Sequence, residues 1–153
     1  MELFRELGAN FLTIITNRIF YVTFTAWFVA QTMKVLLDVV INKRFNFRLF
    51  VGTGGMPSSH TAAVTAGTMM IGMNTGWASP LFMVCLLYCI VVVSDAVGVR
   101  RAAGKQASIL NKMLDEIGHN TFTTERLKEL LGHSPMEAGA GLLIGMIIPW
   151  LMN

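Results

Sequence analysis

Apolar residues run through most of the chain in long blocks, and short polar segments separate these blocks. Residues 19–42 are mostly apolar, with Gln31, Lys34 and Asp38 as the main exceptions, and residues 79–98 form the most uniformly apolar stretch. An α-helix rises about 1.5 Å per residue, so about 20 residues cross the ~30 Å hydrocarbon core of a bilayer. The pattern therefore predicts a membrane helix over each of these two segments.

Two further membrane helices are predicted from apolar blocks that are rich in small residues. One covers residues 58–74, and the other covers residues 134–152, whose only formal charge is Glu137. The second block holds Gly141 and Gly145 four residues apart, a spacing that lets helices pack closely in lipid. The sequence thus predicts four membrane helices, and the glycine pair permits a homodimer without requiring one.

Two amphipathic or polar segments lie outside the four predicted spans. In residues 1–18 apolar side chains recur at helical spacing, which favours a helix in the membrane interface or an extension of the first span. Residues 99–132 are predicted to form a polar helical loop. Within it, residues 99–116 either continue the preceding helix beyond the bilayer or form a separate helix. The whole chain, residues 1–153, is therefore predicted to be one all-α membrane domain.

The amino-acid composition also favours a chain that lies in a lipid bilayer. Of its 153 residues, 54% are hydrophobic and 14% are charged, which is far from the usual composition of a soluble domain. The net charge of +3 is small, and no basic stripe alternates with aromatic residues, so a nucleic-acid partner is not expected. Residues 1–18 do not show the pattern of a cleaved signal peptide, so we expect the membrane segments to remain in the mature protein.

The distribution of basic residues predicts the orientation in the membrane. With four crossings, residues 41–57 and residues 99–132 share one side, and they carry nine of the twelve lysine and arginine residues. Loops rich in lysine and arginine tend to stay in the cytoplasm. We therefore expect this side to be the cytoplasmic side of the membrane, with both termini on the other side.

Three ionisable residues fall inside the predicted spans, all toward the cytoplasmic end: Lys34, Asp95 and Glu137. A charged side chain in a membrane helix costs ~2.5–3.5 kcal/mol on insertion scales, so each needs an explanation. Lys34 lies four residues before Asp38, and the two can neutralise each other, or Lys34 can extend to the headgroups. Asp95 either forms a structural ion pair with Arg100 or Arg101 or takes part in a site.

Two histidines each begin a predicted helix next to serine and proline. His60 ends the stretch "PSSH", in which Ser58 or Ser59 can cap the helix. The first turn of a helix attracts anions, and a histidine there can donate a proton to an anion's oxygen. His133 begins "HSPME", with Glu137 one helical turn later. A carboxylate that holds one ring nitrogen leaves the other as a base or nucleophile, so both histidines are candidate catalytic residues.

These residue types match a phosphate ester at the membrane surface. Arginine and lysine bind phosphate oxygens and stabilise the charge of a phosphoryl group in transfer. The candidate phosphate ligands are Lys34, Ser58, Ser59, Arg100 and Arg101. Zinc would also use histidine and carboxylate, but the spacing fits neither an HExxH helix nor CxxC pairs, so neither a metal nor a cofactor is expected. The third histidine, His119, lacks such neighbours and is predicted to be a surface residue.

At these positions the chain resembles a known family. The stretch "PSSH" resembles the Pro-Ser-Gly-His motif of the type 2 phosphatidic acid phosphatase and vanadium haloperoxidase superfamily. The stretch "GHSPMEAGAG" resembles its last motif, in which an aspartate follows the histidine by four residues. The blocks "AQTMK", "GTGGMPSSHTA", "SDAVGVRRAAGKQASILN" and "LGHSPMEAGAG" look more specifically like a divergent, compact bacterial and plant branch of that superfamily.

The resemblance implies chemistry that needs no divalent metal. It implies that His133 attacks phosphorus to form a phosphohistidine, that Glu137 orients His133 in place of the usual aspartate, and that His60 protonates the leaving alcohol. The phosphoryl oxygens would be held by lysine, serine and arginine side chains of the same motifs: Lys34, Ser59, and Arg100 or Arg101.

The first family motif departs from the pattern, because Ile41 stands where the family has an arginine. Only Arg44 or Arg48 can substitute for that arginine. We therefore count Arg48, together with Asp95, as a supporting residue of the candidate site.

Two functions from different classes fit these residues. The first is a membrane lipid phosphatase that acts on a phosphomonoester or pyrophosphate lipid. The alternative is a non-catalytic membrane protein that binds or translocates phospholipid or polyprenyl phosphate with the same cationic pocket. A binding protein needs positive charge but no nucleophile, so the set of His133, Glu137 and His60 distinguishes the two.

Overall fold

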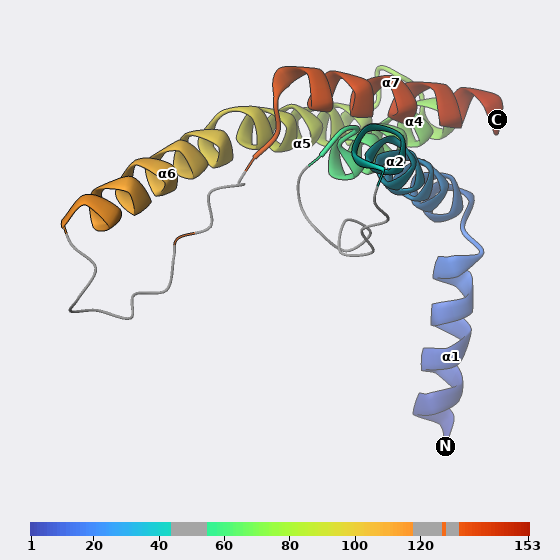
Figure 1. Ribbon diagram of the computed structural model, residues 1–153. Helices are drawn as coiled ribbons and strands as arrows, with labels where there is room; N and C mark the ends of the chain where they lie inside the picture. The colour runs from blue at the N-terminus through green and yellow to red at the C-terminus, as the bar shows by residue number, and fades with distance from the viewer. Residues whose placement is uncertain (44–54, 118–126, 128–131) are drawn as a thin grey trace.

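The computed structural model describes residues 1–43, 55–117, 127 and 132–153 (Figure 1). Arg48 and Arg44, which the sequence offers as substitutes for the family arginine, lie outside these residues, as does His119. The described elements are all α-helices: α1 (Glu2–Ile15), α2 (Arg18–Asn42), α4 (Ser59–Thr75), α5 (Pro80–Val97), α6 (Val99–Ile117) and α7 (Pro135–Leu151). The predicted all-α class is thus confirmed.

Short polar residues fix where the bundle helices begin. The side chains of Asn17, Ser58, Ser79 and Ser134 each accept a hydrogen bond from a backbone N–H in the first turn of α2, α4, α5 and α7, respectively. A proline follows at the first position of α5 and of α7, where its missing N–H costs nothing. These caps explain why each of the four helices begins within a residue or two of the first residue of the corresponding predicted span.

Helix α4 lies at the centre of the fold and packs against α2, α5 and α7. Its buried face carries small side chains, among them Ala62 and Ala66, which let the neighbouring helices approach closely. Helix α1 projects away from one end of this bundle, and α6 projects from the other end as a continuation of α5 (Figure 1). The helix breaks at Gly98, so α6 is a separate helix that directly follows α5.

Two glycines of α7 bring that helix into backbone contact with α4. A Cβ atom added at Gly141 would overlap the carbonyl oxygen of Ser58, and one at Gly145 would lie 2.6 Å from the carbonyl oxygen of Ala62. Such distances leave no room for a side chain. The glycine pair that the sequence singled out therefore packs against α4 of the same chain.

Gly145→Ala is expected to lower the free energy of unfolding by about 1–3 kcal/mol, because the added methyl group would force α4 and α7 apart. Gly139 on the same helix provides the matched control, since a Cβ there meets nothing within 4 Å. Gly139→Ala should leave stability unchanged or raise it by up to about 1 kcal/mol through helix propensity. Thermal unfolding in detergent measures both variants, and equal effects would contradict this account of the interface.

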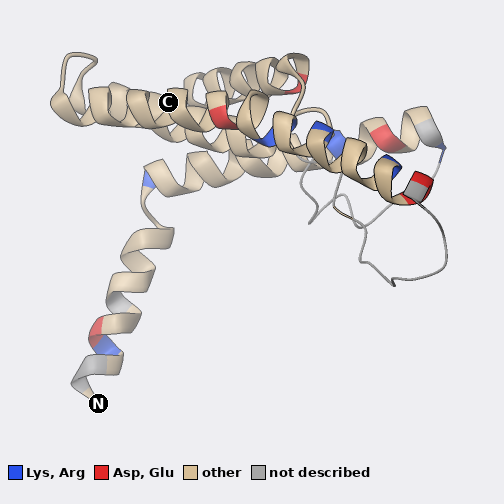
Figure 2. Ribbon diagram, turned by 90° about the vertical axis from the view of Figure 1, so that its left-hand side faces the viewer, with Lys and Arg blue, Asp and Glu red and all other residues tan. Residues whose placement is uncertain are grey.

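Two helical stretches are long and apolar enough to cross a membrane. They are Arg18–Ile41 in α2 and Pro80–Glu116, which joins α5 to α6. Helix α7 is a shorter apolar helix, and α4 has the same length of 17 residues. Charged residues gather at one end of the bundle and along α6 (Figure 2). Two of the four predicted spans are thus supported by length and composition, and the count of four stays a prediction.

Candidate functional site

The two histidine motifs meet where α4 and α7 begin. The backbone N–H of Ser58 donates a hydrogen bond to the carbonyl oxygen of Glu137, with an N···O distance of 3.0 Å. One helical turn further along α7, Gly141 lies against the carbonyl oxygen of Ser58. The fold therefore joins "PSSH" and "HSPME", which are far apart in the sequence, through their backbones.

Glu137 caps α7 and also holds the imidazole of His133. Its Oε2 atom lies 3.0 Å from Nδ1 of His133 and accepts a hydrogen bond of 3.1 Å from the backbone N–H of Ser134. The backbone N–H of Glu137 in turn donates to the Ser134 hydroxyl, which completes a capping box. His133 is only 8% exposed. The ring is therefore fixed through Nδ1, and Nε2 is the nitrogen that remains for chemistry.

The segment before α7 is anchored to the junction of α5 and α6. The backbone N–H of His133 donates to the carbonyl oxygen of Ala96 at 2.9 Å. Gly132 has a φ of +84° and lies against the backbone of Arg100 and Arg101, where a Cβ atom would overlap it. Sequence reasoning missed the role of Gly132, although a glycine directly before the motif histidine was the available signal. This contact brings His133 next to the two arginines.

The first turn of α4 contributes buried serines and an exposed histidine. The hydroxyl of Ser58 is the cap, and it accepts hydrogen bonds from the N–H and the hydroxyl of Thr61 at 3.4 and 3.0 Å. Ser59 is also buried, whereas His60 is exposed. His60 lies close enough to three other groups of the site for direct charge–charge interaction: His133, Lys34 and Arg100. The first turn of α4 therefore faces the same site as His133.

Lys34 enters the site from α2. It is only 3% exposed, its Nζ donates a hydrogen bond of 2.7 Å to Oε1 of Gln31, and its charge interacts with that of Glu137. The backbone of Gly55 covers its methylene groups, because a Cβ added there would lie 3.3 Å from Cγ and Cδ of Lys34. The ammonium group is therefore held inside the bundle. Gln31 is a partner that sequence reasoning did not assign.

Arg100 and Arg101 are exposed at the start of α6. Nε of Arg100 lies 2.6 Å from Oδ2 of Asp95, and the two side chains are 58% and 34% exposed, respectively. The structure thus shows the ion pair between Asp95 and Arg100, and a role of Asp95 in the site stays a prediction.

Asp95→Asn is expected to change the free energy of unfolding by less than about 1 kcal/mol, because exposed ion pairs are screened by solvent. Chemical or thermal unfolding in detergent gives the value. A loss above about 2 kcal/mol would show that the pair holds the α5–α6 junction together and would contradict the expectation that solvent screens it.

Within the described residues, no three histidine, cysteine, aspartate or glutamate side chains gather where they could hold one metal ion. The expected independence from metal stays a prediction.

Together, these features define an all-helical membrane protein with a polar site where two helix starts meet. Residues 15–148 match the divergent PAP2 family, and the chain belongs to this family. A relative named "Uncharacterized membrane protein YuiD", from Bacillus subtilis (strain 168), is 36% identical over 151 residues, which cover 90% of this chain and 94% of the relative. No solved structure matches the chain. The family resemblance drawn from the motifs is thus confirmed.

Proposed function

We propose that this protein is an integral membrane phosphatase that hydrolyses a phosphomonoester or pyrophosphate lipid through a phosphohistidine at His133. The observation that carries the proposal is the 3.0 Å contact between Nδ1 of His133 and Oε2 of Glu137. The contact lies next to a second histidine, His60, and the buried Lys34. A site that only binds a lipid phosphate needs positive charge, but it does not need an imidazole oriented by a carboxylate.

The proposed reaction has two steps. In the first, Nε2 of His133 forms a bond to phosphorus while the bond to the leaving oxygen breaks, and His60 donates a proton to that oxygen. In the second, His60 takes a proton from water as the water oxygen attacks phosphorus, and inorganic phosphate leaves His133. Glu137 keeps Nδ1 protonated and stabilises the positive charge on the ring.

Positive groups and helix geometry support binding of the phosphoryl oxygens. Lys34 supplies an ammonium group inside the bundle, and Arg100 and Arg101 lie next to Gly132 at the α6 start. Ser59 and the backbone N–H groups at the start of α4 add donors where the helix dipole favours an anion. In our proposal these groups stabilise the charge that the phosphoryl group carries during transfer.

The membrane arrangement belongs to the same proposal. Helices α4 and α7 cross the bilayer together with α2 and α5, so that the chain spans a bacterial cell membrane four times. The charged end of the bundle, which includes the site, then faces the cytoplasm (Figure 2). The tendency of loops rich in lysine and arginine to stay in the cytoplasm supports this orientation.

The test is phosphate release from a panel of lipid phosphates by protein purified in detergent with EDTA present. We expect turnover that EDTA does not reduce, that His60→Ala lowers by about 10²–10⁴-fold, and that the control His119→Ala leaves unchanged. If no lipid is turned over and lipid phosphate still binds tightly to His133→Ala protein, the function is binding or translocation instead.

A further inference from the structure

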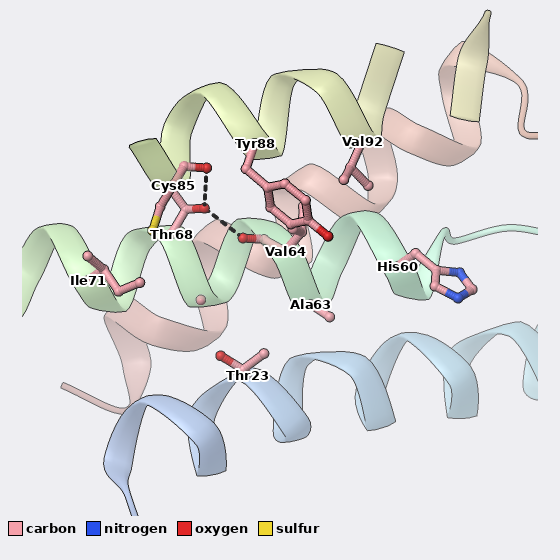
Figure 3. Close-up of a pocket in the computed structure, with 10 residues that line it drawn as sticks. Thr23, His60, Ala63, Val64, Thr68, Ile71, Cys85, Tyr88 and Val92 are labelled. Carbon is pink, nitrogen blue, oxygen red and sulfur yellow. Dashed lines mark hydrogen bonds between the residues drawn. The ribbon is translucent and has the colours of Figure 1, made fainter. Parts of the chain in front are cut away.

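A groove runs along α4 between α2 and α5, and it begins at His60 (Figure 3). Its volume is about 400 Å³, its surface is almost entirely apolar, and it is open along one side. The hydroxyl of Thr68 lies in the groove but donates to the carbonyl oxygens of Val64 and Cys85, at 2.8 and 3.3 Å. Because this hydroxyl is already bonded, the groove favours an apolar occupant.

The groove has a polar end and an apolar end. Its floor follows one face of α4 from His60 over Ala63 and Gly67 to Ile71, and the small side chains keep the floor low. Val92 of α5 lies toward the His60 end, whereas Cys85 lies toward the Ile71 end (Figure 3). Any molecule that fills the groove therefore lies lengthwise, with one end at the candidate site.

The length of the groove matches one leaflet of a bilayer. Ile71 follows His60 by 11 positions, which corresponds to about 16 Å along the helix. This is about half of the ~30 Å hydrocarbon core.

We propose that the groove binds a single linear hydrocarbon chain of the lipid phosphate, with the phosphate at His60 and the end of the chain near Ile71. This inference rests on the proposed function, since it takes the ligand of the site to be a lipid phosphate. The positive charges of Lys34 and Arg100 near His60 complement the phosphate, and the apolar groove complements the chain. The open side lets the chain enter from the leaflet that holds the site.

The first test is photo-cross-linking in His133→Ala protein, in which turnover does not consume the probe. Two hexadecyl phosphates carry a diazirine, one beside the phosphate and one at the end of the chain. We expect the first to label Ala63 or Val92 and the second to label Ile71 or Cys85, and we expect excess unlabelled hexadecyl phosphate to prevent both. Labels that fall equally on Val84 and Leu87, which are exposed on α5, would overturn the proposal.

The second test uses a matched pair of valines on α5. Val92 lines the groove, whereas Val84 is exposed and is not among the residues that line it. Val92→Trp should reduce labelling of Ile71 by the chain-end probe about tenfold or more, because the indole fills the groove, and Val84→Trp should not. Equal labelling in the two variants would overturn the proposal.

These outcomes separate the groove from the phosphatase activity. Ordered labelling without any turnover would contradict the proposed function and leave the groove in place. Turnover with dispersed labelling would contradict the groove alone. Repeating the labelling in competition with farnesyl phosphate distinguishes an isoprenoid chain from a saturated chain as the preferred occupant.

Discussion

Replacing His133 with alanine is expected to lower phosphate release from the lipid substrate by at least about 10³-fold. Without the imidazole no phosphohistidine can form, and removal of a catalytic nucleophile usually costs several orders of magnitude. In the proposed mechanism the remaining positive groups, Lys34, Arg100 and Arg101, still bind phosphate. The variant should therefore lose kcat while its affinity for lipid phosphate changes little.

Two controls accompany this variant. His119→Ala removes a histidine outside both motifs and should retain full activity. Thermal unfolding of His133→Ala shows whether the fold survives the loss of the contact with Glu137. A folded His133→Ala protein that keeps more than about a tenth of the wild-type rate would contradict a nucleophilic His133.

Glu137→Gln is expected to reduce kcat by about 10²–10⁴-fold with little change in stability. Glutamine can also serve as the third residue of a capping box, so α7 should still begin at Pro135. An amide, however, does not stabilise a protonated ring as a carboxylate does, and its NH₂ group favours the wrong tautomer of His133. Phosphate release and thermal unfolding, measured on the same preparation, separate the two effects.

Glu137→Asp provides the conservative comparison for this positioning residue. The resemblance implies that an aspartate stands at this position in related phosphatases, and an aspartate keeps the carboxylate group that a glutamine lacks. We expect kcat of the Glu137→Asp variant to be at least about tenfold higher than kcat of the Glu137→Gln variant. If both variants lose activity only in proportion to lost stability, Glu137 is a helix cap and does not orient His133.

The sequence predicted those parts of the fold and site that depend on local pattern. The start of α4 follows from Ser58, and the start of α7 follows from Ser134 and Pro135, because cap residues act on the turn that follows them. The contact between His133 and Glu137 is also local, since Glu137 is the third residue of the capping box and its side chain reaches back to the residues just before the helix.

The parts that depend on tertiary packing could not be predicted in the same way. The anchoring of His133 to Ala96 joins segments that are far apart in the sequence, and no periodicity reports it. The choice between two partners for Asp95 depended on how α6 leaves α5 at Gly98. The sequence offered two local explanations for Lys34, whereas its burial under Gly55, with Nζ bonded to Gln31, depends on tertiary packing.

The most direct measurement of the central claim is identification of the phosphorylated residue during turnover. Wild-type protein is mixed with lipid phosphate and quenched within milliseconds under alkaline conditions, which preserve phosphohistidine, and its peptides are analysed by mass spectrometry. The proposed mechanism predicts a phosphoryl group on His133 that appears during turnover and is absent from His133→Ala protein. Turnover without any phosphorylated enzyme, or with phosphate on another residue, would contradict a histidine nucleophile at the start of α7.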